Sequence, residues 1–344
     1  MESNSIKFLT LGIESSCDDT SIAVIDEELN VLAEKTASQI DSHKIWGGVI
    51  PELASRMHQE AIMPLLDDVL VEASVTNPAK EISLIASTTG PGLMGSLLVG
   101  AMTARALAFG WNVPFTTVNH LEGHIFAAIA NAKDLKPPFI SLIISGGHTE
   151  IILVKDFGSY ELLGTTRDDA VGESFDKLSK FLGLGYPGGP IIDKLAETGK
   201  VMYDLPMPLC DTGEIEFSFS GLKTAAINLA AKLKEEGRVF GKNVPLNDIA
   251  ASFQNTVCKI LTSKLALAFD KTGIKALTLS GGVAANSAIR SALCDFCNKR
   301  SITLYMPQKH LCTDNGIMIA IAGYFAYKRG EVMNHRVSPS WSLW

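Results

Sequence analysis

KFLTLGIESSCDDTSIAVID (residues 7–26) is the stretch that decides the fold, because it predicts two short buried strands joined by a polar turn. Its apolar runs are short and rich in Ile, Leu and Val, as buried strands are. PFISLIISGGHTEIILVKD (138–156) repeats this layout, with SGGHT as the turn. Each half then continues with a strand, a glycine loop and a helix, at 83–110 and at 276–297. The two halves of the chain therefore predict the same order of elements.

This repetition predicts an α/β fold of two similarly built lobes with a cleft between them. A chain of 344 residues is long enough for two domains. The pair Pro137 and Pro138 falls between the halves, so we expect lobes at 1–136 and 137–344, with a last helix that can pack back on the first lobe. The alternative is one large α/β sheet in which the repetition is a coincidence.

Composition limits the kinds of protein that this chain can be. Hydrophobic residues make up 47% and charged residues 19%, which favours a large core and argues against disorder. The net charge of −7 argues against bulk attraction to a polyanion, so a nucleic-acid substrate would need a local basic patch or a partner. The opening residues lack the basic segment of a secretory signal, the apolar runs are too short to span a bilayer, and the cysteines show no disulfide spacing. We expect a cytoplasmic protein with no membrane contact.

VNHLEGHIFAA (118–128) contains the clearest candidate for a metal site. Apolar residues recur at helical spacing, which places His120 and His124 one turn apart, where both imidazoles can reach one ion. Gly123 costs about 1 kcal/mol within a helix, so we expect another element to pack closely against it. In the metallopeptidase pattern H-E-x-x-H a glutamate follows the first histidine, and here Leu121 takes that place. The alternative is that the histidines cap a helix or face solvent.

A third ligand must come from another part of the chain. Asp314 in LCTDNG (311–316) lies at the expected start of an apolar helix. It is a candidate ligand, but an aspartate in that place commonly caps the helix, and the spacing leaves both roles open. Two histidines and one carboxylate with open positions suit iron(II) or zinc, which act as Lewis acids on an anionic oxygen.

Glycine-rich turns are the candidates for nucleotide binding. ISGGHT (144–149) leaves a predicted strand, and its backbone N–H groups could cradle a phosphate or form an ordinary tight hairpin. Asp176 and Asp193 could accept hydrogen bonds from ribose hydroxyls, or be surface aspartates. YPGGP (186–190) and SGGVAAN (280–286) repeat the theme, and ESSCDDT (14–20) is a further polar turn. Together the turns favour a nucleotide cleft.

In combination and order, these motifs resemble the family of tRNA threonylcarbamoyl-adenosine transferases, known in bacteria as TsaD and formerly labelled O-sialoglycoprotein endopeptidase or glycoprotease. The resemblance runs nearly end to end. It rests on these stretches: LGIESSCDDTSIAV, ASQIDSHKIWGGVIPELASRMH, TTGPGLMGSLLVG, NHLEGHI, ISGGHTE, GESFDKLSKFLGLGYPGGP, FSFSGLKTA, SGGVAANSAIR and CTDNGIMIA. One departure is Asp19, where many relatives have a glutamate, which shortens the reach of that carboxylate by one methylene.

The resemblance implies an actin-like, sugar-kinase-like (ASKHA) fold. It implies transfer of the L-threonylcarbamoyl group from threonylcarbamoyl-adenylate to N6 of adenosine 37 in tRNAs that read codons beginning with A, with release of AMP. It also implies one divalent ion per chain, Fe2+ in preference to Zn2+. The residues carried over are the metal ligands His120, His124 and Asp314, the adenylate contacts Ile143, Ile144, Ser145, Gly146 and Gly147, the nucleoside contacts Asp176, Gly189, Asp193 and Asn286, and Asp18 at the reacting centre.

The resemblance further implies partners. These are tRNA, a TsaB-like paralogue and a TsaE-like ATPase. Two competing interpretations stay open from the residues alone, a zinc peptidase and an actin-like ATPase that regulates other proteins. The reaction product distinguishes them: modified tRNA, peptide fragments or ADP alone.

Overall fold

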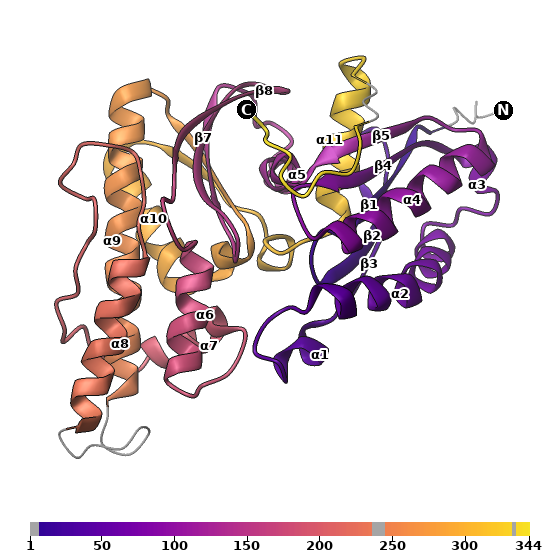
Figure 1. Cartoon of the computed structure of the whole chain (residues 1–344). Helices are drawn as coiled ribbons and strands as arrows, with labels where there is room; N and C mark the ends of the chain where they lie inside the picture. The colour runs from indigo at the N-terminus through magenta and orange to yellow at the C-terminus, as the bar shows by residue number, and fades with distance from the viewer. Residues whose placement is uncertain (1–6, 236–244, 332–334) are drawn as a thin grey trace. The chain divides into compact units, whose positions relative to one another are not determined.

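The computed structural model describes residues 7–235, 245–331 and 335–344. The first six residues, which are part of the opening segment without a signal pattern, lie outside the described residues. The chain forms two compact units, the first made of Met1–Leu135 with Thr313–Trp344 and the second of Lys136–Cys312. Each unit contains one five-stranded sheet with helices packed on it (Figure 1). Across the described residues, no helix has the length and apolar character needed to cross a bilayer.

The two sheets have the same topology. In the first unit the order is β3-β2-β1-β4-β5, and in the second it is β8-β7-β6-β9-β10. In each sheet the first three strands in chain order pair antiparallel with one another, and the last two run parallel to the first. The strands are β1 (Leu9–Glu14), β2 (Asp19–Ile25), β3 (Val31–Ser38), β4 (Ile82–Gly90), β5 (Phe115–Asn119), β6 (Phe139–Ile144), β7 (Thr149–Asp156), β8 (Ser159–Thr165), β9 (Ala276–Ser280) and β10 (Thr303–Tyr305). The predicted duplication is confirmed, and the single-sheet alternative is wrong.

The helices follow the strands where the sequence predicts them. The segments 83–110 and 276–297 form β4 with α4 and β9 with α10, each joined by a glycine loop. The α-helices are α1 (Ile40–Lys44), α2 (Pro51–Glu72), α3 (Pro78–Glu81), α4 (Met94–Trp111), α5 (His120–Ala127), α6 (Val171–Phe181), α7 (Gly188–Ala196), α8 (Ser220–Glu235), α9 (Leu246–Thr272), α10 (Ser287–Arg300) and α11 (Gly316–Lys328). Short 3-10 turns are η1 (Ile129–Asn131), η2 (Gly282–Ala285) and η3 (Lys309–Leu311).

Alternate residues of β1 face two different helical layers. Leu9, Leu11 and Ile13 join a buried apolar cluster with α2 and α4. Gly12 points to the opposite face, which α11 covers, because a Cβ on Gly12 would lie 2.4 Å from the carbonyl oxygen of Gly316. A Cβ on Gly323 would lie 2.3 Å from that of Ala86 on β4. These glycines let the main chain of α11 approach the sheet closely, and in Figure 1 the yellow α11 lies with the indigo and purple elements of the first unit.

A large apolar core of the second unit packs on one face of its sheet. Ile140, Leu142 and Ile144 of β6 pack with apolar side chains of α6, α9 and α10. Because β6 and β9 run parallel, their carboxyl ends meet at one edge of the sheet. The turn after β6 and the loop after β9 therefore lie at the same edge, which is where open α/β sheets bind their ligands.

Candidate functional site

The histidine pair lies on a short buried helix at the end of β5. Asn119 caps α5, since its side-chain oxygen accepts a hydrogen bond from the Leu121 N–H at 2.9 Å. His120 and His124 are 7% and 1% exposed. The two alternatives for the pair, helix capping and exposure to solvent, are therefore wrong.

Asp314 is not a helix cap either. Asn315 caps α11 by accepting a hydrogen bond from the Met318 N–H at 2.9 Å. Gly123 on α5 allows this approach, because a Cβ there would lie 2.8 Å from Cδ1 of Ile319 on α11. Glu122 faces away from the histidines and pairs with Arg329 at 3.4 Å. The packing of α5 on α11 thus brings Asp314 to the histidines.

The three side chains converge on one point. Asp314 Oδ1 lies 3.5 Å from His120 Nε2 and 3.3 Å from His124 Nε2. The candidate ligand atoms all lie within 4.8 Å of one another. Two ligands about 2.1 Å from an ion in tetrahedral geometry are separated by about 3.4 Å, so the observed distances suit a shared ion. In the part of the chain that the structure describes, no other group of His, Cys, Asp and Glu shows this arrangement.

The nearby carboxylates change the proton affinity of the site. Burial alone would lower the pKa of His120, but the charges of Asp314 and Glu14 outweigh it and raise that pKa to about 9. Burial raises the pKa of Asp18, and it raises that of Asp19 to about 7. Burial also raises the pKa of the Cys17 thiol, so Cys17 stays protonated and is a poor metal ligand.

The turn that carries Asp18 is braced by a histidine of α2. His58 is fully buried, and its Nδ1 lies 2.7 Å from Thr20 Oγ1 while its Nε2 lies 3.0 Å from the Cys17 carbonyl oxygen. The Asp18 carbonyl accepts a hydrogen bond from the Gln39 N–H at 3.0 Å. The sequence does contain a signal that His58 is buried. In α2, Ala54, His58 and Ile62 follow at intervals of four and form one buried face.

The glycine turn after β6 approaches two other elements of the second unit. Ser145 Oγ accepts hydrogen bonds from the N–H groups of Gly147 and His148 at 3.3 and 3.0 Å. The N–H of Gly172, at the start of α6, donates to the Ser145 carbonyl at 3.2 Å. The loop after β9 comes equally close, because a Cβ on Gly281 would lie 2.3 Å from the Ile144 carbonyl oxygen. Two backbone N–H groups of the turn thus already donate to Ser145.

The expected nucleoside contacts also have partners within the protein. The Asp176 carboxylate accepts a hydrogen bond from the N–H of Gly188, the neighbour of Gly189, at 2.6 Å. Asp193 accepts from the backbone N–H and the hydroxyl of Ser287, at 2.9 and 2.8 Å. Asn286 caps α10 and donates to Gln254 at 2.8 Å. These residues form a connected region around α7, in which each polar group is held in one orientation.

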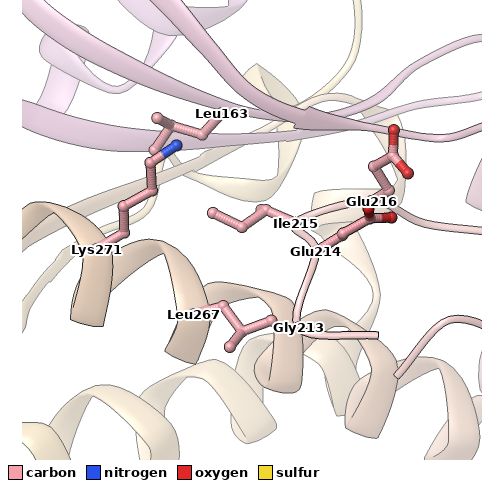
Figure 2. Close-up of a pocket in the computed structure, with 7 residues that line it drawn as sticks. All are labelled: Leu163, Gly213, Glu214, Ile215, Glu216, Leu267 and Lys271. Carbon is pink, nitrogen blue, oxygen red and sulfur yellow. The ribbon is translucent and has the colours of Figure 1, made fainter. Parts of the chain in front are cut away.

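A separate cavity of about 550 Å³ lies in the second unit, between β8, the segment 213–216 and α9 (Figure 2). Figure 2 shows the ammonium of Lys271 pointing toward Leu163, while the carboxylates of Glu214 and Glu216 lie away from it. Both glutamates pair with Arg167. None of the residues that the sequence predicts for the site lines this cavity, so the candidate site is built elsewhere.

Comparison with known proteins gives consistent matches along the chain. A family profile described as "tRNA N6-adenosine threonylcarbamoyltransferase" (TsaD) matches residues 30–321. A protein of that name from Dictyoglomus turgidum is 48% identical over 322 residues, which cover 94% of this chain and 94% of that protein. One from Caldicellulosiruptor bescii is 47% identical over 331 residues, which cover 95% and 96%.

Solved structures with a similar fold are far more distant in sequence. Full-length HypF in its phosphate- and nucleotide-bound form is similar with a TM-score of 0.63 at 14% identity, covering 95% of this chain and 47% of that one. Component A of (R)-2-hydroxyglutaryl-CoA dehydratase from Acidaminococcus fermentans has a TM-score of 0.54 at 14% identity, covering 94% and 100%. These likenesses concern the fold alone, and they confirm the expected actin-like, sugar-kinase-like architecture.

Proposed function

Because this chain belongs to the TsaD family of tRNA N6-adenosine threonylcarbamoyltransferases, we propose that His120, His124 and Asp314 hold the metal ion of that activity. The enzyme transfers the L-threonylcarbamoyl group from threonylcarbamoyl-adenylate to N6 of adenosine 37 in tRNA. The observation that carries the ion assignment is the approach of both Nε2 atoms to Asp314 Oδ1. Two imidazoles and a carboxylate suit Fe2+, with Zn2+ as the alternative, and either ion when bound supplies Lewis-acid stabilisation of an anionic oxygen.

The reaction requires an activated donor. The N6 lone pair of adenine is delocalised into the ring, so the amine attacks only a carbonyl with a good leaving group. In the adenylate that carbonyl is a mixed anhydride with phosphate. The C–N bond to N6 forms, the C–O bond to phosphate breaks, AMP leaves, and N6 loses one proton. The protein contributes orientation, which can supply several kcal/mol, and excludes the water that would hydrolyse the donor.

We propose that Asp18 accepts the N6 proton, directly or through a water molecule. Burial raises the pKa of this carboxyl, which makes its ionised form a stronger base than a free aspartate. His58 and Gln39 form hydrogen bonds with the backbone of the turn that carries Asp18, so the main chain from which this carboxylate projects is held in place. A positioned base of this kind typically contributes about 10²- to 10⁴-fold.

We propose that the second unit binds the adenylate. Ile143 and Ile144 end β6, and Ser145, Gly146 and Gly147 form the turn that would receive the threonylcarbamoyl-phosphate portion. A side chain on Gly146 or Gly147 would meet nothing within 4 Å, so a ligand can approach this backbone. The nucleoside would contact the remaining predicted residues of this unit, which are Asp176, Gly189, Asp193 and Asn286.

A product assay tests the function directly. The purified protein, supplied with threonylcarbamoyl-adenylate and unmodified tRNA, is expected to form threonylcarbamoyl-adenosine and AMP, measured by nucleoside analysis of the digested tRNA. Peptide fragments from a sialoglycoprotein would favour the peptidase alternative, and ADP without modified tRNA would favour an ATPase regulator. The orientation of Glu122, which pairs with Arg329, leaves the histidine pair without the general base that a peptidase of the H-E-x-x-H type needs.

We propose that the protein acts in the cytoplasm with a TsaB-like paralogue and a TsaE-like ATPase as well as with tRNA. The net charge of −7 supports a partner that contributes positive potential for tRNA. A surface suited to the paralogue lies on α4, where Met94, Leu98 and Met102 follow at intervals of four and are exposed. Such a row forms one helix face, and a row of exposed apolar side chains marks an interaction surface.

Replacing Leu98 with glutamate is expected to weaken capture of the paralogue at least 10-fold, because a buried unpaired carboxylate costs several kcal/mol. The paralogue is first recovered by co-purification with the tagged protein from its native source. Its affinity for the unaltered protein and for each variant is then measured by titration. Val201→Glu, at an exposed apolar residue of the second unit, is the matched control and should bind as the unaltered protein does. If the two variants bind the paralogue with equal affinity, the α4 surface is not its binding site.

A further inference from the structure

Glu14 is a buried carboxylate at the end of the largely apolar strand β1, and its contacts account for its presence. Its side chain is 0% exposed. Oε1 accepts a hydrogen bond from the Ser16 N–H at 2.5 Å, and Oε2 accepts one from the Thr88 hydroxyl. Oε2 also lies 3.3 Å from Nδ1 of His120. A buried carboxylate without partners would be costly, so these donors are what keep it there.

The contact with His120 involves the ring nitrogen that does not face Asp314. Nε2 of His120 faces Asp314, whereas Nδ1 faces Glu14 and the hydroxyl of Ser16, which lies 3.1 Å away. An ionised carboxylate only accepts hydrogen bonds, while a serine hydroxyl can donate or accept. The arrangement in which Nδ1 carries the proton is therefore the one that satisfies both neighbours. In the neutral ring this arrangement leaves the lone pair on Nε2, where a metal ion needs it.

We infer that Glu14 is a positioning residue that fixes the tautomer and ring orientation of His120 for metal binding. This inference rests on the proposed metal site. A histidine ligand generally donates its second N–H to a carboxylate, a carbonyl or water, and such a partner also increases the basicity of the ligating nitrogen. His124 differs, because its Nδ1 has no hydrogen-bond partner among the described residues. Glu14 thus acts on one of the two imidazoles.

Replacing Glu14 with glutamine separates this role from packing, because the side chain keeps its shape. If the amide oxygen accepts from the Ser16 N–H, the amide N–H₂ faces His120 Nδ1, which must then be unprotonated, and the ring proton moves to Nε2. If the amide is flipped, its N–H₂ meets the Ser16 N–H, and two donors face each other. Either arrangement weakens the metal site.

The experiment measures Zn2+ affinity of the metal-stripped full-length protein by competition with a chromophoric chelator. Glu14→Gln is expected to bind Zn2+ about 10- to 100-fold more weakly than the unaltered protein, the usual effect of losing such a partner. Glu150→Gln is the matched control, because Glu150 is also a buried strand glutamate but its Oε2 has no hydrogen-bond partner among the described residues. Its affinity should equal that of the unaltered protein.

A second measurement uses the unaltered protein and does not depend on how the variant folds. Nitrogen NMR of the Zn2+-saturated, ¹⁵N-histidine-labelled protein is expected to show His120 with Nε2 bound to zinc and Nδ1 protonated. Zinc on Nδ1, or an affinity of a folded Glu14→Gln variant within two-fold of the unaltered protein, overturns the inference. If His120→Ala binds Zn2+ as tightly as the unaltered protein, the metal site itself is wrong, which is a different outcome.

Discussion

Replacing His120 with alanine is expected to abolish threonylcarbamoyl transfer to tRNA while the protein remains folded. The substitution removes one of three ligands, and an ion held by His124 and Asp314 alone would be lost at ordinary concentrations. Losing Lewis-acid stabilisation of several kcal/mol corresponds to a rate decrease of about 10³-fold or more. The measurement is the amount of threonylcarbamoyl-adenosine formed in unmodified tRNA, with the adenylate supplied and Fe2+ or Zn2+ added back after metal removal.

The control for this experiment is His310→Ala, which removes an exposed histidine of η3 in the second unit. It should leave transfer unchanged. Circular dichroism and thermal unfolding establish that the His120→Ala protein is folded. Full activity of this variant after metal removal contradicts the metal role, because no three-ligand site would remain.

Replacing Gly12 with alanine is expected to lower the free energy of unfolding by about 3 kcal/mol and to weaken metal binding as well. The added Cβ would lie 2.4 Å from the Gly316 carbonyl oxygen and 2.5 Å from the Ala320 nitrogen. Both are main-chain atoms of α11, so no side chain can rotate to make room. The helix must move away from the sheet, and Asp314, which directly precedes this helix, moves with it.

Denaturant unfolding and Zn2+ titration of the same preparations test both parts of this expectation. Gly110→Ala is the matched control, because Gly110 lies near the end of α4 and an added Cβ would meet nothing within 4 Å. Alanine is the better helix former, so this variant should gain about 0.5–1 kcal/mol. An unchanged stability and metal affinity of Gly12→Ala would mean that α11 does not depend on close approach to β1.

Sequence reasoning left two features of the site open for the same reason. The sequence TDN before α11 offers three capping residues, and local reasoning could not decide that Asn315 caps while Asp314 faces the histidines. The roles of His58 and Glu14 depend on what each side chain meets across the fold, which local patterns do not show. The resemblance to the family identified Asp314 as a metal ligand, a role that spacing alone had left open.

The sequence by itself determined the paired strands at 7–26 and 138–156, the glycine loops, the repeated order of elements and the one-turn spacing of His120 and His124. These features depend on residues close together in the chain, where hydrophobic period and turn composition are local signals. The sequence left open whether the last helix packs back on the first lobe, and the tertiary structure decided that α11 packs on the sheet of the first unit, where Gly12 and Gly323 leave room for it. That contact depends on the matching shapes of distant segments, which no local pattern records, and it is what places Asp314 beside the two imidazoles.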